Sequence, residues 1–302
     1  MIERAMHQFS IEPAGSVATK RTGHRILMER TIGKILMDSG KLDRDGVQRV
    51  FRLHKKNGMR FGEAAIKLKL VTKADVQHAL FVQFDYPCLR PGDAAVSAEV
   101  VAAYHPQSAQ SEALRDLRSR LMVTWFDGGH KTLAVVSPNS GEGRTYVTAN
   151  LAVAFSQLGE KTLLIDADLR APRQHRIFNV TNPIGLSTIL SGRAGMEAIE
   201  PISHFGNLSV LAAGPVPPNP LELLSRPEFS KLLRGSARRY DVILVDTAAG
   251  ERGSDAQTVA GRAKGALIVA RQDRAQIADV AAIAENIAAY GAQVVGAVLN
   301  RL

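Results

Sequence analysis

The sequence holds a single cysteine, Cys88, among its 302 residues. No intramolecular disulfide can form, which fits a reducing compartment. Aromatic residues are scarce, at 5% of the chain. No apolar run approaches the roughly 20 residues that a membrane-spanning helix requires, and residues 1–30 lack the apolar region of a signal peptide. We therefore expect a cytoplasmic protein that lies at the inner membrane only through a partner.

The charge of the chain is unevenly distributed. Residues 1–90 carry 17 Lys and Arg against 9 Asp and Glu, whereas the remaining residues are close to neutral within a total net charge of +9. A basic first third beside a neutral remainder indicates two domains with different partners. Solvated basic helix faces are the alternative explanation.

Composition and periodicity divide the chain into four segments. We expect a loose tail over 1–24, helices over 25–90, a connector over 91–110 and a larger domain over 111–302. The expected strands of that domain cover 132–136, 162–165, 208–212, 242–245, 266–270 and 293–299. The expected helices cover 111–121, 145–158, 227–236, 255–263 and 277–290. This alternation predicts an α/β fold with a mostly parallel sheet and helices on both faces, preceded by a small helical domain.

The helical segment contains an internal repeat. One copy begins at Thr31 and the other at Arg60, and five residues separate the copies. The matching pairs are Gly33 with Gly62, Leu42 with Val71, Val47 with Val76, and His54 with Gln83. The repeat predicts two similar helical units, which act either as a ligand site or as a plain packing module.

A glycine-rich turn follows the first expected strand of the larger domain. It reads Ser-Pro-Asn-Ser-Gly-Glu-Gly-Arg-Thr over 137–145 and leads into a helix. Such a turn directs backbone N–H groups and a helix N-terminus at one point, which attracts phosphate. We expect the loop to bind nucleotide through Ser140, Gly141, Glu142, Gly143, Arg144, Thr145 and Tyr146. The P-loop pattern is only partly met, because Pro138 stands in place of its first glycine and Arg144 in place of its lysine.

Aspartates end two further apolar runs. Asp166 and Asp168 follow the run at 162–165, and Asp246 follows the run at 242–245. The carboxyl ends of parallel strands share one edge of a sheet, so these side chains are expected beside the glycine-rich turn. Carboxylate and hydroxyl oxygens suit Mg²⁺. The sequence therefore predicts a magnesium site built from Thr145, Asp168 and Asp246.

Residues 111–302 resemble the cytoplasmic domain of the bacterial tyrosine kinases of polysaccharide export. The matching motifs are Leu-Ile-Asp-Ala-Asp-Leu-Arg at 164–170, Tyr-Asp-Val-Ile-Leu-Val-Asp-Thr at 240–247, Pro-Pro-Asn-Pro-Leu-Glu-Leu-Leu at 217–224 and Glu-Ala-Leu-Arg-Asp-Leu-Arg at 112–118. The resemblance implies a P-loop fold of the MinD and ParA type that binds ATP and Mg²⁺. It also implies catalysis by Asp166, Asp168 and Arg144, with Asp166 assisting the attacking hydroxyl.

The same resemblance implies further contacts and partners. Asn300 would lie beside the adenine, and Glu112, Arg115 and Arg118 would join subunits in a homo-oligomer. A Wzz-like membrane polysaccharide co-polymerase is the expected protein partner, and no DNA partner is expected. The function implied is regulation of exopolysaccharide chain length and export.

A finer resemblance concerns the fused helical domain. The Gly-Glu-Gly-Arg loop together with that domain resembles the EpsG-type chain-length determinant kinases. The repeat is similar to the cyclic di-GMP-binding N-terminal domain of MshE-type ATPases. That likeness implies a cyclic di-GMP site at Ile32, Gly33, Arg60, Phe61, Gly62 and Gln83. The first copy departs from the pattern, with Thr31 in place of arginine and His54 in place of glutamine.

Two other functions stay open. A ParA- or MinD-like positioning ATPase shares the expected fold, but it carries a second lysine where Asn139 stands. A non-enzymatic sensor of ATP and cyclic di-GMP is favoured by Arg144 and by the scattered positions of the five tyrosines, since the kinase family uses a C-terminal tyrosine cluster as its autophosphorylation target.

Overall fold

The computed structural model describes residues 31–90 and 92–301. The expected tail at 1–24, and residues 25–30 of the expected helical domain, lie outside the described residues. The chain divides into two units, with the boundary between Tyr86 and Pro87. No helix in the described ranges is both long enough and apolar enough to cross a bilayer.

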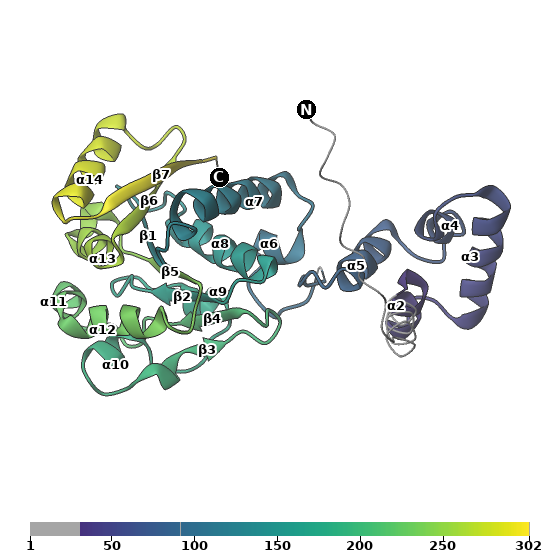
Figure 1. Cartoon of the computed structure of the whole chain (residues 1–302), viewed down its shortest axis with the longest axis horizontal. Helices are drawn as coiled ribbons and strands as arrows, with labels where there is room; N and C mark the ends of the chain where they lie inside the picture. The colour runs from purple at the N-terminus through teal and green to yellow at the C-terminus, as the bar shows by residue number, and fades with distance from the viewer. Residues whose placement is uncertain (1–30, 91, 302) are drawn as a thin grey trace, which may run out of the picture. The chain divides into compact units, whose positions relative to one another are not determined.

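Unit 1 shows the repeat as two pairs of helices (Figure 1). Its described helices are α2 (Ile32–Asp38), α3 (Arg44–Asn57), α4 (Phe61–Lys67) and α5 (Lys73–Gln83). The longer helix of each pair begins with a side-chain cap, since Asp43 accepts from Gly46 N at 2.7 Å and Thr72 accepts from Asp75 N at 3.1 Å. The two copies interlock, because α2 packs on α5 and α3 packs on α4. Their shared core includes Leu36, Val50, Ala64, Ala65 and Ala79.

Unit 2 is built on a seven-stranded sheet in the order β3-β4-β2-β5-β1-β6-β7. All pairings are parallel except that of β3 with β4. The strands are β1 (Thr132–Val136), β2 (Thr162–Asp166), β3 (Glu200–Pro201), β4 (Leu208–Leu211), β5 (Val242–Asp246), β6 (Gly265–Arg271) and β7 (Gln293–Asn300). The predicted mostly parallel sheet is confirmed. Strands β2 and β5 are buried along their whole length and β1 from Leu133 onward, which explains their continuous apolar sequences.

Helices cover both faces of this sheet (Figure 1). One face carries α6 (Val101–Tyr104), α7 (Ala109–Leu121), α8 (Arg144–Leu158) and α9 (Gln174–Ile177). Directly after α7, η1 (Met122–Phe126) forms a single π-turn. The other face carries α10 (Leu186–Leu190), α11 (Pro220–Ser225), α12 (Pro227–Ser236), α13 (Asp255–Ala263) and α14 (Ile277–Ala289). Two short 3₁₀ segments, η2 (Met196–Ala198) and η3 (Gly250–Arg252), complete the described elements.

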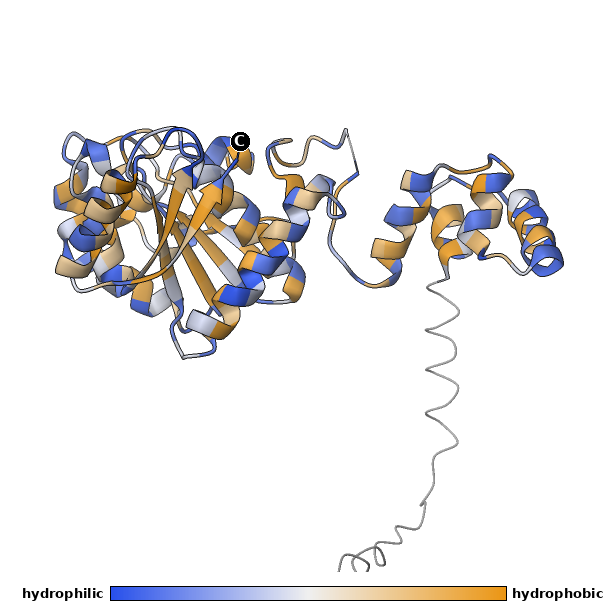
Figure 2. Cartoon of the chain, turned by 90° about the horizontal axis from the view of Figure 1, so that it is seen from above, coloured by the Kyte–Doolittle hydropathy of each residue, from blue (hydrophilic) through white to orange (hydrophobic). Residues whose placement is uncertain are grey.

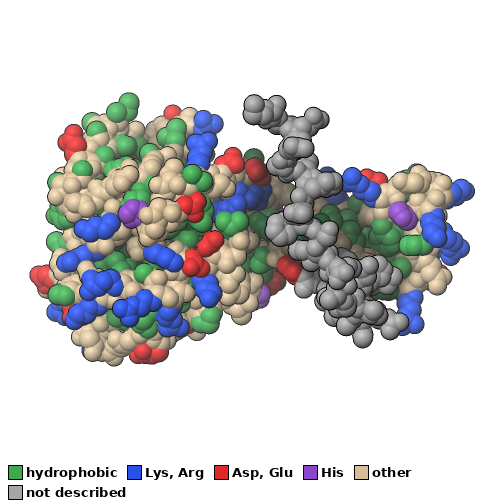
Figure 3. All heavy atoms as spheres, in the orientation of Figure 1, with side chains coloured by type: hydrophobic (Ala, Val, Ile, Leu, Met, Phe, Trp, Pro, Cys, Tyr) green, Lys and Arg blue, Asp and Glu red, His purple; other side chains and the backbone are tan. Residues whose placement is uncertain are grey.

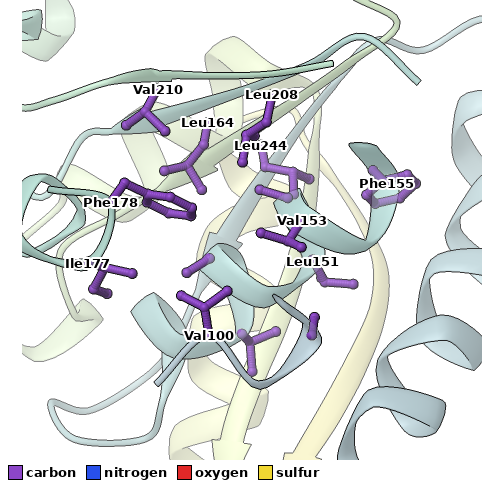
Figure 4. Close-up of a cluster of buried hydrophobic side chains, with 14 of the residues drawn as sticks. Val100, Leu151, Val153, Phe155, Leu164, Ile177, Phe178, Leu208, Val210 and Leu244 are labelled. Atoms are coloured by element: carbon purple, nitrogen blue, oxygen red, sulfur yellow. The ribbon is translucent and has the colours of Figure 1, made fainter. Parts of the chain in front are cut away.

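Each face of the sheet has its own apolar core. In Figure 4, Phe155, Leu151 and Val153 of α8 lie near Leu164, Leu208 and Leu244 of the sheet. Figure 2 shows the strands as largely hydrophobic, with hydrophilic residues frequent on the outer helices. Burial on both faces fixes the register of the strands and hence the position of the residues at their ends.

The segment expected as a connector over 91–110 differs from the prediction. Residues 93–110 belong to unit 2, and Val96, Val100 and Ala103 are buried in the core beneath α8. The Tyr104 hydroxyl donates to the carbonyl oxygens of Asp93 and Val96, each at 2.6 Å, and Asn150 of α8 accepts from Ala102 N at 3.0 Å. The segment lacks helical periodicity. Its few large or branched apolar residues are separated by Ala, Ser and Pro, so the sequence gives no sign that they are buried.

Candidate nucleotide-binding site

The glycine-rich turn joins the end of β1 to the start of α8. Gly141 and Gly143 both have a left-handed backbone, with φ of 79° and 92°, which a residue with a side chain rarely adopts. Ser140 N donates to Glu251 Oε1 at 2.9 Å, and hydrogen bonding from the Ser140 side chain together with this backbone contact lowers the pKa of the Glu251 carboxyl. A loop amide is thus already paired with an anionic oxygen. The geometry suits a phosphate cradle.

The three expected aspartates meet at the carboxyl edge of the sheet. Asp166 and Asp246 are direct neighbours in the pairing of β2 with β5. Asp166 accepts from the backbone N–H groups of Asp168, Arg173 and Gln174 at 3.2, 3.1 and 3.0 Å. Asp168 lies further out and accepts from Arg170 N and Ala171 N. Asp166 therefore shapes the loop that carries Asp168.

Arg144 lies between these carboxylates. Its Nη1 donates to Ser137 Oγ at 2.6 Å and its Nη2 to Asp168 Oδ2 at 3.3 Å, while its Nε is 3.6 Å from Asp246 Oδ1. The side chain is 9% exposed. A residue in the position of the P-loop lysine thus forms ion pairs with the expected metal ligands.

Burial changes the protonation chemistry of the aspartates. Removal from water raises the pKa of Asp166 well above its ordinary value, and the neighbouring Asp246 and Asp168 charges raise it further. Burial also raises the pKa of Asp246, against the opposing effects of Arg144, Gln174 and Thr145. A carboxyl with a raised pKa is a better proton acceptor near neutral pH. Asp166 is fully buried, however, so its assistance to a hydroxyl would require the loop at 166–174 to open.

Gln174 is a site residue that the sequence analysis missed. It is fully buried, and its Nε2 donates to Asp246 Oδ2 at 2.9 Å and to Thr145 O at 3.2 Å. It thereby connects the third aspartate to the residue expected to bind Mg²⁺. The short helix α9 carries it, and four residues are too few to show a helical period.

Asn300 and Tyr146 flank the loop. Asn300 ends β7, and its Nδ2 donates to Glu142 O at 3.0 Å. A methyl group on Gly143 would lie 2.0 Å from that nitrogen, so Asn300 closes directly on the turn. Tyr146 lies in the first turn of α8 and lines an apolar groove with α7 and β7; burial raises its pKa.

A cavity of about 640 Å³ opens next to the loop. Its lining includes Arg271, Arg274 and Arg301, none of which the sequence analysis singled out. Arg271 Nη1 donates to Gly141 O at 3.3 Å, and a methyl group on Gly141 would lie 2.9 Å from Arg274 Nη1. Arg271 ends β6, Arg274 lies in the turn after it and Arg301 follows β7, and nothing in the local sequence distinguishes these three from ordinary surface arginines.

Several polar atoms at the site are buried in the described residues without a hydrogen-bond partner. They are Asp246 Oδ1, Arg144 Nε, Gln174 Oε1 and Glu142 Oε1. Such atoms are costly unless a ligand or water satisfies them. No three His, Cys, Asp or Glu side chains in the described ranges form a cluster that could hold a metal by themselves. The donors therefore fit an ion that also takes ligands from a nucleotide, as Mg²⁺ commonly does.

The residues expected at a subunit interface lie on α7. Arg115 pairs with Glu112 within the helix and donates to Pro106 O at 2.5 Å, while Arg118 Nη1 donates to Ala154 O at 3.1 Å. Both arginines therefore already contact backbone carbonyl groups within unit 2. Their expected intersubunit role stays a prediction.

The residues expected to bind cyclic di-GMP lie in unit 1. Ile32 and Gly33 begin α2, Arg60 precedes α4, which starts with Phe61 and Gly62, and Gln83 ends α5. A methyl group on Gly62 would lie 2.6 Å from Val76 Cγ1, and one on Gly33 would lie 3.2 Å from the Phe61 ring. The repeated glycines therefore allow close helix packing. Arg60 is exposed and Gln83 is half-buried.

Comparison with known proteins agrees with this geometry. Residues 133–302 match the family model of the CobQ/CobB/MinD/ParA nucleotide binding domain. The chain is 35% identical to the tyrosine-protein kinase YwqD of Bacillus subtilis, over 67% of this chain and 85% of that protein. It is 34% identical to the putative tyrosine-protein kinase CapB of Staphylococcus aureus, over 65% of this chain and 86% of that protein.

Solved structures show the same fold. The chimerical protein CapA2B2 superposes with a TM-score of 0.64 and 31% identity, over 74% of this chain and 98% of that chain. The septum site-determining protein MinD of Pyrococcus horikoshii, complexed with Mg-ADP, gives a TM-score of 0.51 and 28% identity, over 57% of this chain and 70% of that chain. The expected P-loop fold of the MinD type is confirmed. On its sequence and its fold alike, the chain belongs to the bacterial tyrosine-protein kinase family.

Proposed function

We propose that this protein is an ATP-dependent tyrosine kinase that regulates the chain length and export of an exopolysaccharide. One observation carries the proposal. A phosphate-type loop meets three buried aspartates at the carboxyl edge of the sheet, and four buried polar atoms there have no hydrogen-bond partner within the described residues. Kinship with named bacterial tyrosine-protein kinases supplies the reaction class.

The residues at this edge fit Mg-ATP. The N-terminus of α8 and the loop amides would bind the phosphates, and Thr145, Asp168 and Asp246 would hold the metal. When bound, Mg²⁺ neutralises the charge of the phosphates during transfer. Arg271 and Arg274 border Gly141 and would receive the nucleotide from the cavity side. Asn300 holds the loop closed against β7.

Arg144 has to exchange partners when nucleotide binds. Its guanidinium is held by Ser137 and Asp168 beside Asp246, and these carboxylates are the proposed metal ligands. Phosphate oxygens suit the planar guanidinium as well as carboxylates do. In this proposal Arg144 turns from the aspartates to the phosphates, while Asp166 keeps the loop at 166–174 in place and becomes the proton acceptor once that loop opens.

Phosphotyrosine mass spectrometry after incubation with Mg-ATP tests the proposal. The full chain should gain phosphate on tyrosine, and Asp246→Asn should not. ATP binding without phosphotyrosine and without hydrolysis would contradict the kinase and leave a sensor. Hydrolysis without phosphotyrosine would instead support a positioning ATPase.

Assembly on a membrane polysaccharide co-polymerase is part of this proposal, with α7 joining copies of the chain. Arg115→Ala with Arg118→Ala should shift the mass measured by light scattering towards the monomer. Arg120→Ala on the same helix is the matched control, since Arg120 is exposed. An oligomer that survives the double change would assign both arginines to contacts within unit 2.

For unit 1, we propose cyclic di-GMP binding of the EpsG type. The exposed Arg60 would contact a phosphate or a guanine edge, and Gln83 would donate a hydrogen bond to the same ligand. Calorimetric titration of the full chain with cyclic di-GMP should show binding that Arg60→Ala abolishes and Arg52→Ala preserves. Equal binding by both variants, or no binding at high micromolar ligand, would leave unit 1 as a partner dock.

A further inference from the structure

The amino edge of the sheet carries a row of cations that the proposed kinase reaction does not use. Lys131, Lys161 and Lys264 each directly precede a strand, namely β1, β2 and β6. They span more than a hundred residues of the chain, and the strand order places all three along one edge. The C-terminal end of α12 and the residues after it add Arg234, Arg238 and Arg239 along the same edge.

Two cavities open along this edge. One, of about 430 Å³, is lined in part by Lys161, Arg238 and Arg239. The other, of about 470 Å³, is lined in part by Lys131, Arg234, Arg262 and Lys264. Neither lining contains an Asp or Glu. Asp241 of the same edge is paired with Lys131 at 3.2 Å and accepts from the backbone N of Lys161. Figure 3 shows Lys and Arg side chains gathered over the region that α12 occupies in Figure 1.

Five of these cations are exposed, and their side chains form no hydrogen bond or ion pair within the described residues. We call them the amino-edge patch: Lys161, Arg234, Arg238, Arg239 and Lys264. By contrast, Lys131 is paired with Asp241, and Arg262 donates to Ser230 Oγ and Ser225 O. The patch holds its positive charge uncompensated, although residues 91–302 are nearly neutral as a whole.

The shape of the patch indicates the kind of partner. Strands lie about 4.8 Å apart, so the edge from β4 to β6 spans roughly 19 Å. The cations are spread along that length rather than converging on one point, as they would around a single phosphate. An extended anionic surface matches such a row, and each Lys or Arg near an anionic leaflet adds to the attraction.

We propose that the amino-edge patch binds the surface of an anionic lipid bilayer. Each parallel strand places this patch at one end and the nucleotide site at the other, about 16 Å away for five residues. A bilayer seated on the patch therefore leaves the glycine-rich loop open to nucleotide. The proposal does not depend on kinase activity, because no residue of the patch contributes to the nucleotide site.

Vesicle co-sedimentation of the full chain tests the proposal. The protein should bind vesicles of phosphatidylcholine with phosphatidylglycerol, should not bind phosphatidylcholine alone, and should be released as the salt concentration rises. Changing all five patch residues to Gln should weaken binding at least about tenfold. A matched variant removes five exposed cations of unit 1, at Arg52, Lys56, Lys67, Lys69 and Lys73, and should stay within about threefold of the parent.

The outcomes separate the explanations. Equal binding to neutral and anionic vesicles, or loss of binding only in the unit 1 variant, would overturn the proposal. So would tight binding to duplex DNA that anionic vesicles fail to compete away, since that result assigns the patch to nucleic acid. Unchanged thermal unfolding and unchanged ATP binding of the patch variant show that its fold and nucleotide site are intact.

Discussion

Asp241 directly precedes strand β5 and Asp246 ends it, and each of these aspartates faces a cation. At the amino edge, Asp241 lies 3.2 Å from Lys131, and both side chains are more than two-fifths exposed. At the carboxyl edge, Asp246 lies 3.6 Å from Arg144, and the side chains are 1% and 9% exposed. The shorter pair is the weaker one, because water screens it and exposed pairs contribute about 0–1 kcal/mol.

The buried pair is more sensitive to mutation, because water cannot solvate either of its charges. Removal of one partner leaves a charge whose desolvation nothing offsets. Burial thus makes the carboxyl edge sensitive to single changes in chemistry, whereas the amino edge acts through the sum of many exposed charges. The experiments below compare the two edges, from the largest expected effect to the smallest.

The two aspartates that flank the core of β5, Asp241 before it and Asp246 at its end, give the sharpest test. Asp246→Asn should lower the turnover of Mg-ATP by about 10²–10³-fold, since it removes a proposed metal ligand. Asp241→Asn should stay within about twofold, because its pair is exposed and remote from the loop. Steady-state ATP hydrolysis measures both. Similar losses in the two variants would mean that β5 acts through its stability alone.

The cation at the carboxyl edge should matter for folding as well. Arg144→Ala should lower the free energy of unfolding by about 3 kcal/mol at neutral pH, because it leaves Asp168 and Asp246 uncompensated. Arg144→Lys keeps the charge and should lose about 1 kcal/mol. At the amino edge, Lys131→Ala should cost less than about 1 kcal/mol. Urea titration gives all three values, and an Arg144→Ala loss as small as that of Lys131→Ala would contradict the buried pair.

The carboxyl edge was largely predictable from the sequence. Asp166, Asp168 and Asp246 each follow an apolar run, and parallel strands bring such positions together. The cavity arginines, Gln174 and the contacts of Arg144 were not predictable there. Gln174 is four residues beyond Arg170 on a helix too short to show a period. The pairing of Arg144 with the aspartates depends on side-chain direction, which no spacing reveals.

The amino edge was not predicted at all. Lys131, Lys161 and Lys264 are single lysines before strands, and each is unremarkable in its own stretch of sequence. Only the strand order, in which β1 lies between β5 and β6, places them in one row. The prediction of a connector over 91–110 was wrong for a related reason. Val100 and Ala103 pack against residues of α8, some fifty positions later in the chain.

Substitution of a glycine should have a different effect at each edge, on stability at the amino edge and on nucleotide binding at the carboxyl edge. A methyl group on Gly265, at the start of β6, would lie 2.3 Å from the Trp125 ring, which is buried and holds Thr132 O through its Nε1. Gly265→Ala should therefore lower the free energy of unfolding by about 2 kcal/mol through overpacking.

Gly143→Ala is the counterpart at the carboxyl edge. It meets only the end of the Asn300 side chain, but its backbone has φ of 92°. We expect it to weaken nucleotide binding more than stability. Thermal unfolding combined with ATP titration separates the two effects. A larger loss of stability in Gly143→Ala than in Gly265→Ala, with nucleotide binding retained, would contradict this expectation.

The smallest expected effect concerns pH. The pKa of Asp166 is raised by burial and by the nearby Asp246 charge, so the folded protein holds this proton more tightly than the unfolded chain does. Ionisation of Asp166 therefore costs stability as pH rises from about 4, the unfolded value, through the folded-state pKa. Asp166→Asn removes that cost but loses one of three backbone hydrogen bonds. Relative to the parent, the variant should be less stable near pH 4 and should gain on the order of 1 kcal/mol by pH 8. Urea titrations across this range, with Asp241→Asn as the exposed control, measure the trend, and a constant difference between variant and parent would show that Asp166 ionises equally easily in both states.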